Sequence, residues 1–341
     1  MEFYMNYFVT GAAGFIGSYV SCALLEKGHR VIAVDSLNDY YSPELKQFRL
    51  KNLLNKKGFT FFAGRIEDSA LLEHIFSANA IDRVIHLAAQ AGVRYSIENP
   101  AAYGSANLTG FLNILEACRK YKPDHLVFAS SSSVYGLNKK TPYAETDAVD
   151  HPISLYAATK KANEVIAHSY SHLYGIPATG LRFFTVYGPL GRPDMAYFKF
   201  AEKILKGKTI DVYNQGDMLR DFTYIDDIVR GVIDISNFPP SVQSTQSAKT
   251  ETPDISFSAP FEIYNIGNSC PERLTDFISI LEDCLGKKAE KRFLPMQPGD
   301  VYITAADTAK LYRKIGWKPS TPLTEGLQKF ASWFLNFYNV D

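Results

Sequence analysis

The 341-residue sequence predicts an α/β fold built on a doubly wound parallel sheet, the Rossmann arrangement. Apolar runs of strand length alternate with helical patterns, which is the order of parallel strands joined by right-handed crossovers. The first strand is followed by three glycines spaced G-x-x-G-x-x-G, and an acidic residue ends the second strand. Dinucleotide-binding domains carry these features in this order, so the sequence predicts such a domain near the N-terminus.

The glycine-rich turn lies between the first strand and a helix expected over residues 15–25, and a second strand is expected over 30–34. Gly11 allows a tight turn, Gly14 lets the backbone approach a pyrophosphate, and Gly17 lets helix and strand pack closely. The helix N-terminus presents free N–H groups to the pyrophosphate anion. The turn therefore predicts a dinucleotide diphosphate site.

The acidic residue after the second strand is Asp35, which lies 24 residues beyond Gly11. This spacing is close to the offset of about 20 residues at which an acid accepts hydrogen bonds from the adenosine ribose. A carboxylate at this place would repel the 2′-phosphate of NADP. The sequence therefore predicts NAD as the cofactor.

Further elements follow along the chain. Strands are predicted over 59–63, 83–89, 125–130 and 178–184, and helices over 108–121 and 154–174. We divide the chain into an NAD-binding domain at 1–184 and a smaller mixed α/β substrate domain at 185–341, with 220–235 as a candidate for return to the first domain. Residues 237–260 are interpreted as a surface insertion, since Ser, Thr or Pro fill 12 of their 24 positions.

The composition gives no sign of a nucleic-acid or membrane partner. Lys+Arg and Asp+Glu both number 36, so no net charge favours an anionic polymer or surface. No apolar run reaches the length of a membrane span, and the first residues lack a signal-peptide pattern. The four cysteines form no C-x-x-C pair, which predicts free thiols in a reducing cytoplasm.

A candidate catalytic pair lies on the predicted helix 154–174. Tyr156 and Lys160 are four residues apart and share a helix face. A free tyrosine, with a pKa near 10, is a poor base, but a nearby lysine and the positive nicotinamide both favour the phenolate. Tyr156 is therefore a candidate general base, and Ser131 at a strand exit could orient the same substrate oxygen. A surface pair is the alternative, which the preceding dinucleotide pattern disfavours.

Two other sets of polar residues receive a structural interpretation. Glu164, His168 and His172 are spaced four apart, and we interpret them as a solvated helix stripe rather than a metal site, since no fourth ligand is apparent. His86, inside the predicted strand 83–89, is interpreted as a core histidine with its hydrogen bonds satisfied.

Motifs along nearly the whole chain resemble those of the extended short-chain dehydrogenase/reductases, and within them the nucleotide-sugar epimerases. The motifs are TGAAGFIG, LAAQAGVRYS, SSSSVYG, YAATK, RFFTVYGP, RDFTYIDD and YNIGN. Three further segments, LNDYYSPELK, GRPDMAYFKF and MQPGDV, are similar to UDP-glucuronate 4-epimerases. Those isomerases interconvert UDP-glucuronate and UDP-galacturonate through a transient 4-keto sugar, with tightly bound NAD. The resemblance therefore implies a UDP-sugar substrate.

The resemblance also implies a role for each matching residue. Tyr156 is the expected base, Lys160 the ligand of the nicotinamide ribose, and Ser131 the partner of the C4 oxygen. The expected NAD contacts are Gly11, Gly14, Phe15, Ile16, Gly17, Asp35, Ile66, Leu87, Ala88, Ala89 and Lys160. The expected UDP-sugar contacts are Ser131, Ser132, Ser133, Tyr156, Thr185, Arg192, Tyr213, Arg220 and Asp300.

Within that set, Arg220 is expected at the diphosphate, Asp300 and Tyr213 at uridine, and Arg192 at the substrate carboxylate. One departure is Arg65, which stands where relatives usually carry an Asp near the adenine. The resemblance further implies a homodimer formed through helices 107–121 and 154–174, and a place in polysaccharide biosynthesis.

Alternative functions remain open at this stage. The nearer ones are another UDP-hexose 4-epimerase, and a dehydratase or decarboxylase on the same scaffold. Dehydratases of the family carry an Asp-Glu pair after the catalytic hydroxyl, where this chain has Ser132 and Ser133. The alternative of a different class is a dinucleotide-sensing regulator without catalytic activity, which would usually lack the Tyr or the Lys.

Overall fold

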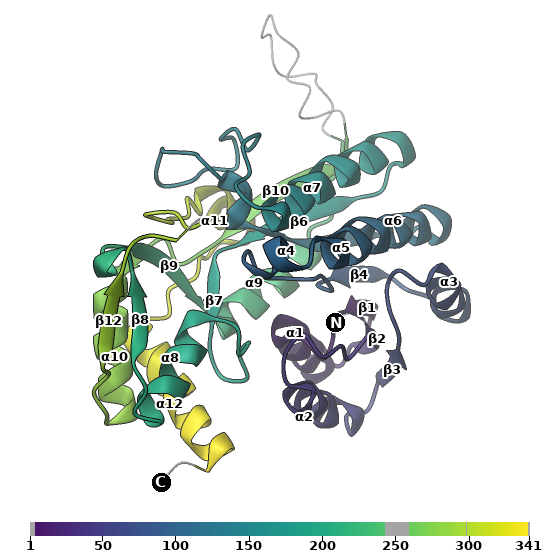
Figure 1. Ribbon diagram of the computed structural model, residues 1–341. Helices are drawn as coiled ribbons and strands as arrows, with labels where there is room; N and C mark the ends of the chain where they lie inside the picture. The colour runs from purple at the N-terminus through teal and green to yellow at the C-terminus, as the bar shows by residue number, and fades with distance from the viewer. Residues whose placement is uncertain (1–3, 243–258, 298, 340–341) are drawn as a thin grey trace, which may run out of the picture.

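The computed structural model describes residues 4–242, 259–297 and 299–339 (Figure 1). Its main sheet has seven strands in the order β10-β6-β5-β4-β1-β2-β3. Their bounds are β1 Asn6–Thr10, β2 Arg30–Asp35, β3 Phe59–Ala63, β4 Arg83–His86, β5 His125–Ser131, β6 Ala178–Phe183 and β10 Phe261–Ile266. All six neighbouring pairs are parallel, which confirms the predicted doubly wound sheet.

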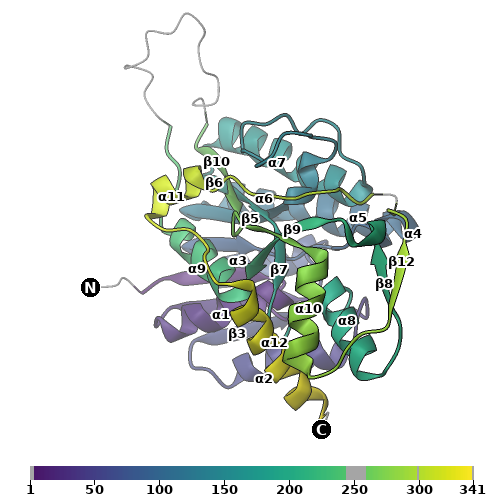
Figure 2. The ribbon, with the colours of Figure 1, turned by 90° about the vertical axis from the view of Figure 1, so that its left-hand side faces the viewer.

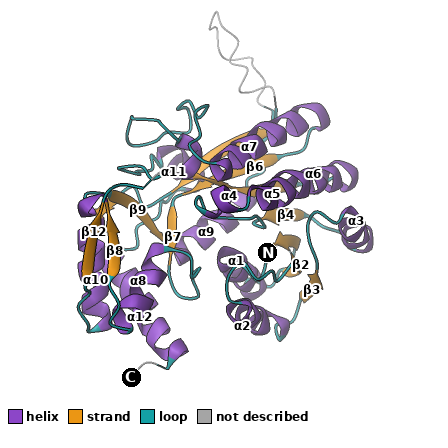
Figure 3. Ribbon diagram, viewed as in Figure 1, coloured by secondary structure: helices purple, strands orange, loops and turns teal. Residues whose placement is uncertain are grey.

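Helices cover both faces of this sheet (Figure 3). The helices are α1 Phe15–Glu26, α2 Pro43–Leu54, α3 Ser69–Ala78, α6 Gly110–Tyr121, α7 Leu155–Tyr174 and α9 Ile225–Ser236. Alternate strand residues face opposite sides, so Val9 packs in the core under α1 and α9 while Phe8 packs in the core under α3 and α6. Short turns connect β4 to α6: α4 Tyr95–Glu98, α5 Pro100–Tyr103 and the π-helical segment Gly104–Thr109.

The remaining elements form a smaller assembly beside the carboxyl ends of the main strands (Figure 1). One small sheet contains β7 Thr185–Tyr187, β9 Leu219–Tyr224 and β11 Pro271–Arg273, and a second pairs β8 Ile210–Tyr213 with β12 Lys291–Leu294. Figure 2 shows α8 Ala196–Leu205, α10 Leu274–Leu285 and α12 Leu323–Tyr338 lying together, and α11 spans Ala309–Ile315. Aromatic rings from α8 and α12, such as Phe198 and Phe330, fill the space between them.

Most predicted boundaries agree with the structure to within one residue, but β4 is shorter than expected. It ends at His86, where the sequence predicted a strand to Ala89. The Thr10 hydroxyl accepts the N–H groups of Leu87 and Ala88, at 3.1 and 3.0 Å. The Leu87 N–H also bonds to the Thr10 carbonyl oxygen at 3.3 Å, which is the last bond of the ladder, whereas the Ala88 N–H bonds to the side chain instead. The segment therefore leaves the sheet as an open loop.

Two segments after residue 184 pack with the main sheet. Helix α9 packs against α1, and β10 joins the sheet edge beside β6. The division into domains at residues 184 and 185 stays a prediction, although the suggested return of 220–235 has a counterpart in α9. The predicted insertion at 237–260 lies largely outside the described residues, since 243–258 are not among them. In the described part of the chain, no helix combines the length and apolar character that a membrane crossing requires.

Candidate active site

A cavity of about 770 Å³ opens between the carboxyl ends of the main strands and the smaller assembly. This is the edge of an open α/β sheet at which ligands bind. Every residue that the sequence predicted to contact cofactor or substrate lines this cavity, from Gly11 to Asp300. The structure therefore brings the predicted set together in one place, while the role of each residue stays a proposal.

The glycine-rich turn has no room for side chains. Gly11 has φ +71°, and a Cβ added to it would lie 2.8 Å from the Ala88 amide nitrogen. A Cβ added to Gly17 would lie only 2.1 Å from the Gly11 carbonyl oxygen. Gly14 precedes α1 as its N-cap and makes no side-chain cap, so the amides of the first turn face the cavity. The turn leaves an open cradle that fits the diphosphate of NAD.

Asp35 is fixed at the edge of this cradle by two backbone amides. Its Oδ2 accepts from the Ala13 N–H at 3.0 Å, and its Oδ1 accepts from the Leu37 N–H at 2.8 Å. The carboxylate is half-buried beside the turn. This position suits the adenosine ribose and opposes a 2′-phosphate.

We expect Asp35→Ala to weaken NAD binding by about tenfold or more, because hydrogen bonds to a charged group are worth about 1.5–3 kcal/mol. The preference for NAD over NADP should shrink, since the repulsion is lost. Calorimetric titration of both cofactors measures this, with Glu44→Ala, an exposed acid on α2, as the matched control. Equal affinities before and after the mutation would remove Asp35 from the site.

His86 lies under the cofactor loop as a buried, neutral side chain. Because the Thr10 hydroxyl already accepts two N–H groups, it donates its own proton to His86 Nδ1, at 2.8 Å. Burial and, to a smaller extent, the charge of Lys160 together lower the pKa of His86 to about 3. His86 is therefore a core histidine, as interpreted from the sequence, with its Nδ1 hydrogen-bonded.

Helix α7 carries the candidate catalytic pair into the cavity. Ser154 caps the helix by accepting the Ala157 N–H at 3.1 Å, which places Tyr156 in the first turn. Lys160 lies one turn further and is only 2% exposed. Its Nζ donates to the carbonyl oxygen of Ala129 on β5, at 2.8 Å. Burial lowers the pKa of Lys160 to about 8, and the negative charge of Glu164 opposes this.

The electrostatic surroundings of Tyr156 differ from the expectation in one respect. Burial raises the pKa of the phenol, and the effects that lower it come first from the charge of Arg192 and then from a hydrogen bond with Ser131. Lys160 instead directs its ammonium group to the β5 backbone. Arg192 is therefore the cation that most favours the phenolate in this structure, a role that the sequence assigned to Lys160.

A row of hydroxyls lines the cavity opposite Tyr156. The Ser131 hydroxyl donates to Ser133 Oγ at 3.1 Å and accepts the Ser133 N–H at 3.2 Å. Ser132 and Thr185, at the starts of a 3-10 turn and of β7, line the same wall. Hydroxyls of this kind donate hydrogen bonds from fixed directions, as an oxygen-rich ligand requires.

Arg192 lies in the cavity in a bidentate ion pair that the sequence did not reveal. Its Nε donates to Asp194 Oδ1 at 3.0 Å and its Nη2 to Asp194 Oδ2 at 2.5 Å. The Tyr40 hydroxyl donates to the same carboxylate at 3.2 Å. The pair occupies one edge of the guanidinium, so a ligand would meet the Nη1 side. Asp194 and Tyr40 lie inside the GRPDM and LNDYY motifs, which were the signal that could have found them.

The far end of the cavity holds the residues predicted to contact the nucleotide. Arg220 is half-buried and donates through Nη1 to the Leu219 and Tyr302 carbonyls, at 2.9 and 3.1 Å. Arg94, which the sequence analysis did not single out, lies over the ring of Tyr213 and pairs with Asp300 at 3.6 Å. Basic groups therefore gather at this end, as a diphosphate would require.

Arg49 connects the glycine-rich turn to the loop that precedes Arg192. It is 1% exposed and donates to the Ala13 carbonyl in the glycine-rich turn at 3.1 Å. It also donates to the carbonyls of Leu190 and Gly191, at 2.6 and 3.0 Å, directly before Arg192. One buried side chain thus joins the predicted cofactor loop to the predicted substrate loop.

The interpretation of Glu164, His168 and His172 as one solvated stripe is wrong for Glu164. Residues four apart on a helix are displaced by about 40° around its axis, so a spacing of four drifts off a single face. Glu164 is buried in an ion pair with Arg182 of β6, whereas His172 is exposed at the helix end. The sequence showed the spacing but not the buried cation across from it.

The glycine-rich turn, the acid after β2 and the Tyr156–Lys160 pair on α7 together define an extended short-chain dehydrogenase/reductase. A family model described as GDP-mannose 4,6 dehydratase matches residues 8–330. An uncharacterized protein of Escherichia coli O111:H- is 56% identical over 98% of this chain and 100% of its own length. UDP-glucuronate 4-epimerase 3 of Arabidopsis thaliana is 49% identical over 97% of this chain and 76% of its own length.

A solved structure is similar over the same extent. It is that of UDP-glucuronic acid 4-epimerase from Bacillus cereus in complex with UDP-glucuronic acid and NAD, with a TM-score of 0.85 and 34% identity over 98% of this chain and 100% of that chain. This chain belongs to the extended short-chain dehydrogenase/reductase family, together with the UDP-glucuronate 4-epimerases.

Proposed function

We propose that this protein is an isomerase that inverts C4 of UDP-glucuronate to give UDP-galacturonate, with NAD held throughout. The observation that carries the proposal is the meeting of Tyr156, Ser131 and Arg192 in a cavity that also contains the glycine-rich cradle. Relatives at about half identity and a similar solved structure carry this activity in their names.

The residues of the chain supply proton transfer and orientation. NAD, when bound, would supply the hydride acceptor and donor for C4. Tyr156 removes the proton of the C4 hydroxyl and gives it back after the sugar has turned over. Ser131 orients the C4 oxygen, and Arg192 stabilises the phenolate form of Tyr156. Lys160, with its charge held in a buried position, binds the nicotinamide ribose.

The substrate carboxylate explains why the cavity needs several hydroxyls and a cation. Oxidation at C4 of a glucuronate makes a β-keto acid, which loses CO₂ easily when its C–C bond stands perpendicular to the carbonyl plane. Hydrogen bonds from Ser132, Ser133 and Thr185 hold the carboxylate near the ring plane, and Arg192 faces it as the cation. Asp194 orients that guanidinium through its bidentate pair.

The rival functions fit the site less well. A dehydratase of this family needs an Asp-Glu pair where the chain has Ser132 and Ser133, even though the matching family model takes its description from a dehydratase. A regulator without activity would not need Tyr156 and Lys160 in one cavity. A neutral UDP-hexose has no carboxylate for Arg192 to face.

The test is to incubate the purified protein separately with UDP-glucuronate, UDP-glucose and dTDP-glucose and to identify the products by NMR. We expect UDP-galacturonate from the first sugar, without added cofactor, because NAD is reduced and reoxidised within one turnover. Steady production of NADH would identify a dehydrogenase instead, and conversion of UDP-glucose alone would identify a different epimerase.

The protein is proposed to act as a cytoplasmic homodimer that supplies polysaccharide biosynthesis. Helices α6 and α7 pack side by side, and their outer surface exposes Leu112, Val165 and Leu173. Apolar side chains gathered on two neighbouring helices suit a symmetric four-helix contact.

In sedimentation velocity, Val165→Glu should convert a dimer into a monomer, and an unchanged dimer would exclude this face. All four cysteines are free, which suits a reducing compartment.

A further inference from the structure

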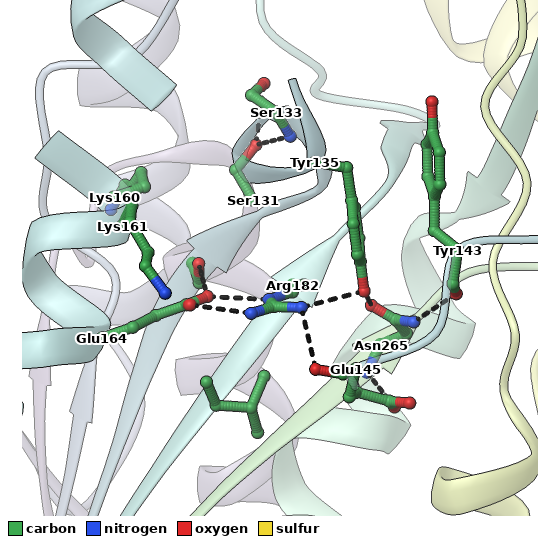
Figure 4. Close-up of polar contacts among 12 residues, drawn as sticks. Ser131, Ser133, Tyr135, Tyr143, Glu145, Lys160, Lys161, Glu164, Arg182 and Asn265 are labelled. Carbon is green, nitrogen blue, oxygen red and sulfur yellow. Dashed lines mark hydrogen bonds and ion pairs between the residues drawn. The ribbon is translucent and has the colours of Figure 1, made fainter. Parts of the chain in front are cut away.

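Glu164 and Arg182 form a buried ion pair directly behind the catalytic end of β5 (Figure 4). Arg182 Nε and Nη2 donate to Glu164 Oε1 and Oε2, both at 2.8 Å, which is a bidentate geometry. Each residue is 2% exposed. Burying two charges costs about as much free energy as their attraction returns, so an ion pair of this kind adds little net stability. Stability alone therefore does not explain why the pair lies at this place.

The pair is bonded to the strand that ends in the active site. The Ser130 hydroxyl donates to Glu164 Oε1 at 2.6 Å, and Ser130 is the cross-strand neighbour of Arg182. Lys160 holds the preceding residue, since its Nζ donates to the Ala129 carbonyl. Two charged residues of α7, one turn apart, thus fix the two residues of β5 that precede Ser131.

The other side of Arg182 holds the turn that follows the serines (Figure 4). Its Nη1 donates to the Tyr135 hydroxyl at 3.0 Å, and that hydroxyl donates to Asn265 Oδ1 at 2.7 Å. Asn265 in turn donates to the Tyr143 carbonyl at 2.8 Å. The serine-rich turn is therefore bonded to the ion pair both before Ser131 and after Ser133.

We propose that Glu164 and Arg182 act as a positioning unit for the catalytic residues. The pair holds both ends of the serine-rich turn, and so sets Ser131 and Lys160 against Tyr156, while Glu164 supplies the negative charge nearest along α7 to the ammonium group of Lys160. This inference rests on the roles of Tyr156 and Lys160 in the proposed function.

The charge of Lys160 depends on this arrangement. The titratable groups that interact with it are Glu164 from α7 and His86 from β4, with Arg182 of β6 behind Glu164, and Tyr156 lies one turn earlier on α7. His86 is neutral and Tyr156 is protonated at rest. Glu164 is therefore the group that keeps the pKa of Lys160 from falling further below its usual value. Removing that carboxylate lowers the pKa and discharges the lysine at a lower pH.

The test uses variants of the full-length protein. Glu164→Gln alone leaves Arg182 as an unpaired buried cation, so the informative variant is Glu164→Gln with Arg182→Met, which leaves no buried charge from the pair. Glu282→Gln is the matched control, because Glu282 is also a buried helical glutamate in an ion pair but lies on α10, away from the cavity.

We expect the double variant to bind NAD and to keep its KM within about threefold of the wild-type value. In a plot of kcat against pH, the decline on the alkaline side should begin at a lower pH than in wild type. Each unit of fall in the pKa of Lys160 lowers its charged fraction about tenfold above that pKa. At alkaline pH, kcat should therefore fall about tenfold. Glu282→Gln should leave the pH profile unchanged. A folded double variant with the wild-type profile and kcat would overturn the proposal.

Two further measurements decide the remaining outcomes. If the double variant does not fold, Ser130→Ala removes the hydroxyl between the pair and the turn without changing a charge. A lower kcat at unchanged KM then supports positioning, and a wild-type kcat overturns it. NMR titration of isotope-labelled lysine in the NAD complex reports the pKa of Lys160 without turnover. It therefore separates failure of this inference from failure of the proposed function.

Discussion

Replacing Tyr156 with Phe should abolish epimerisation while leaving the fold and UDP-sugar binding intact. The change removes one hydroxyl and keeps the ring, which packs edge-on against Tyr103 with centroids 6.2 Å apart. General acid–base catalysis contributes about 10²–10⁴-fold to rates, so kcat should fall by at least about 100-fold. The loss should be in kcat rather than in affinity, because the phenol acts on a proton of the bound sugar.

The measurement is kcat together with circular dichroism and calorimetric titration of UDP-glucuronate. Tyr312→Phe is the control, since this tyrosine is exposed on α11 and lies outside the cavity. If the Tyr156→Phe protein keeps more than about a tenth of the wild-type kcat, another group must serve as the base.

Arg192→His and Thr185→Val should divert the reaction toward loss of CO₂. In the proposed function each change removes a group that holds the substrate carboxylate near the ring plane, so the 4-keto intermediate can reach the geometry in which the C–C bond breaks. A hydrogen bond to a charged group is worth about 1.5–3 kcal/mol, which shifts the partition about tenfold or more. The products should then include a 4-keto-pentose that wild type does not release.

NMR of the products and trapping of CO₂ measure this partition. Arg292→His on β12 and Thr209→Val are matched controls, because both residues are exposed and lie outside the cavity. The account of substrate choice is wrong if both site variants epimerise UDP-glucuronate at the normal rate without CO₂ release. Arg192→His also removes the ion-pair partner of Asp194, which keeps the hydrogen bond from Tyr40.

The first helix and the second strand could be predicted to within a residue because local signals mark their ends. Gly11 turns the chain with a positive φ, and α7 is bounded by the Ser154 cap and by Gly175 in the left-handed conformation. These signals act within a few residues and are visible in any single sequence. The doubly wound sheet then follows from their repetition along the chain.

Other features depended on partners far along the chain. The pairing of β10 with β6 joins residues more than eighty positions apart, and no local pattern indicates which sheet a short strand will join. The burial of Glu164 requires Arg182 on a neighbouring strand, and the occupied edge of Arg192 depends on how one loop folds back on itself. Only the family resemblance placed Asp300 in the same site as Gly11, because nothing in their spacing brings them together.

The bonds of Arg49 have a consequence for anyone who wishes to redesign this enzyme. Because one guanidinium holds both Ala13 and the Leu190–Gly191 backbone, a mutation that shifts the glycine-rich turn should also move the loop that is proposed to contact the sugar. Changes made to alter the nucleotide preference and changes made to alter the sugar preference should therefore not add independently. The two selectivities are best varied in one combined library rather than optimised one after the other.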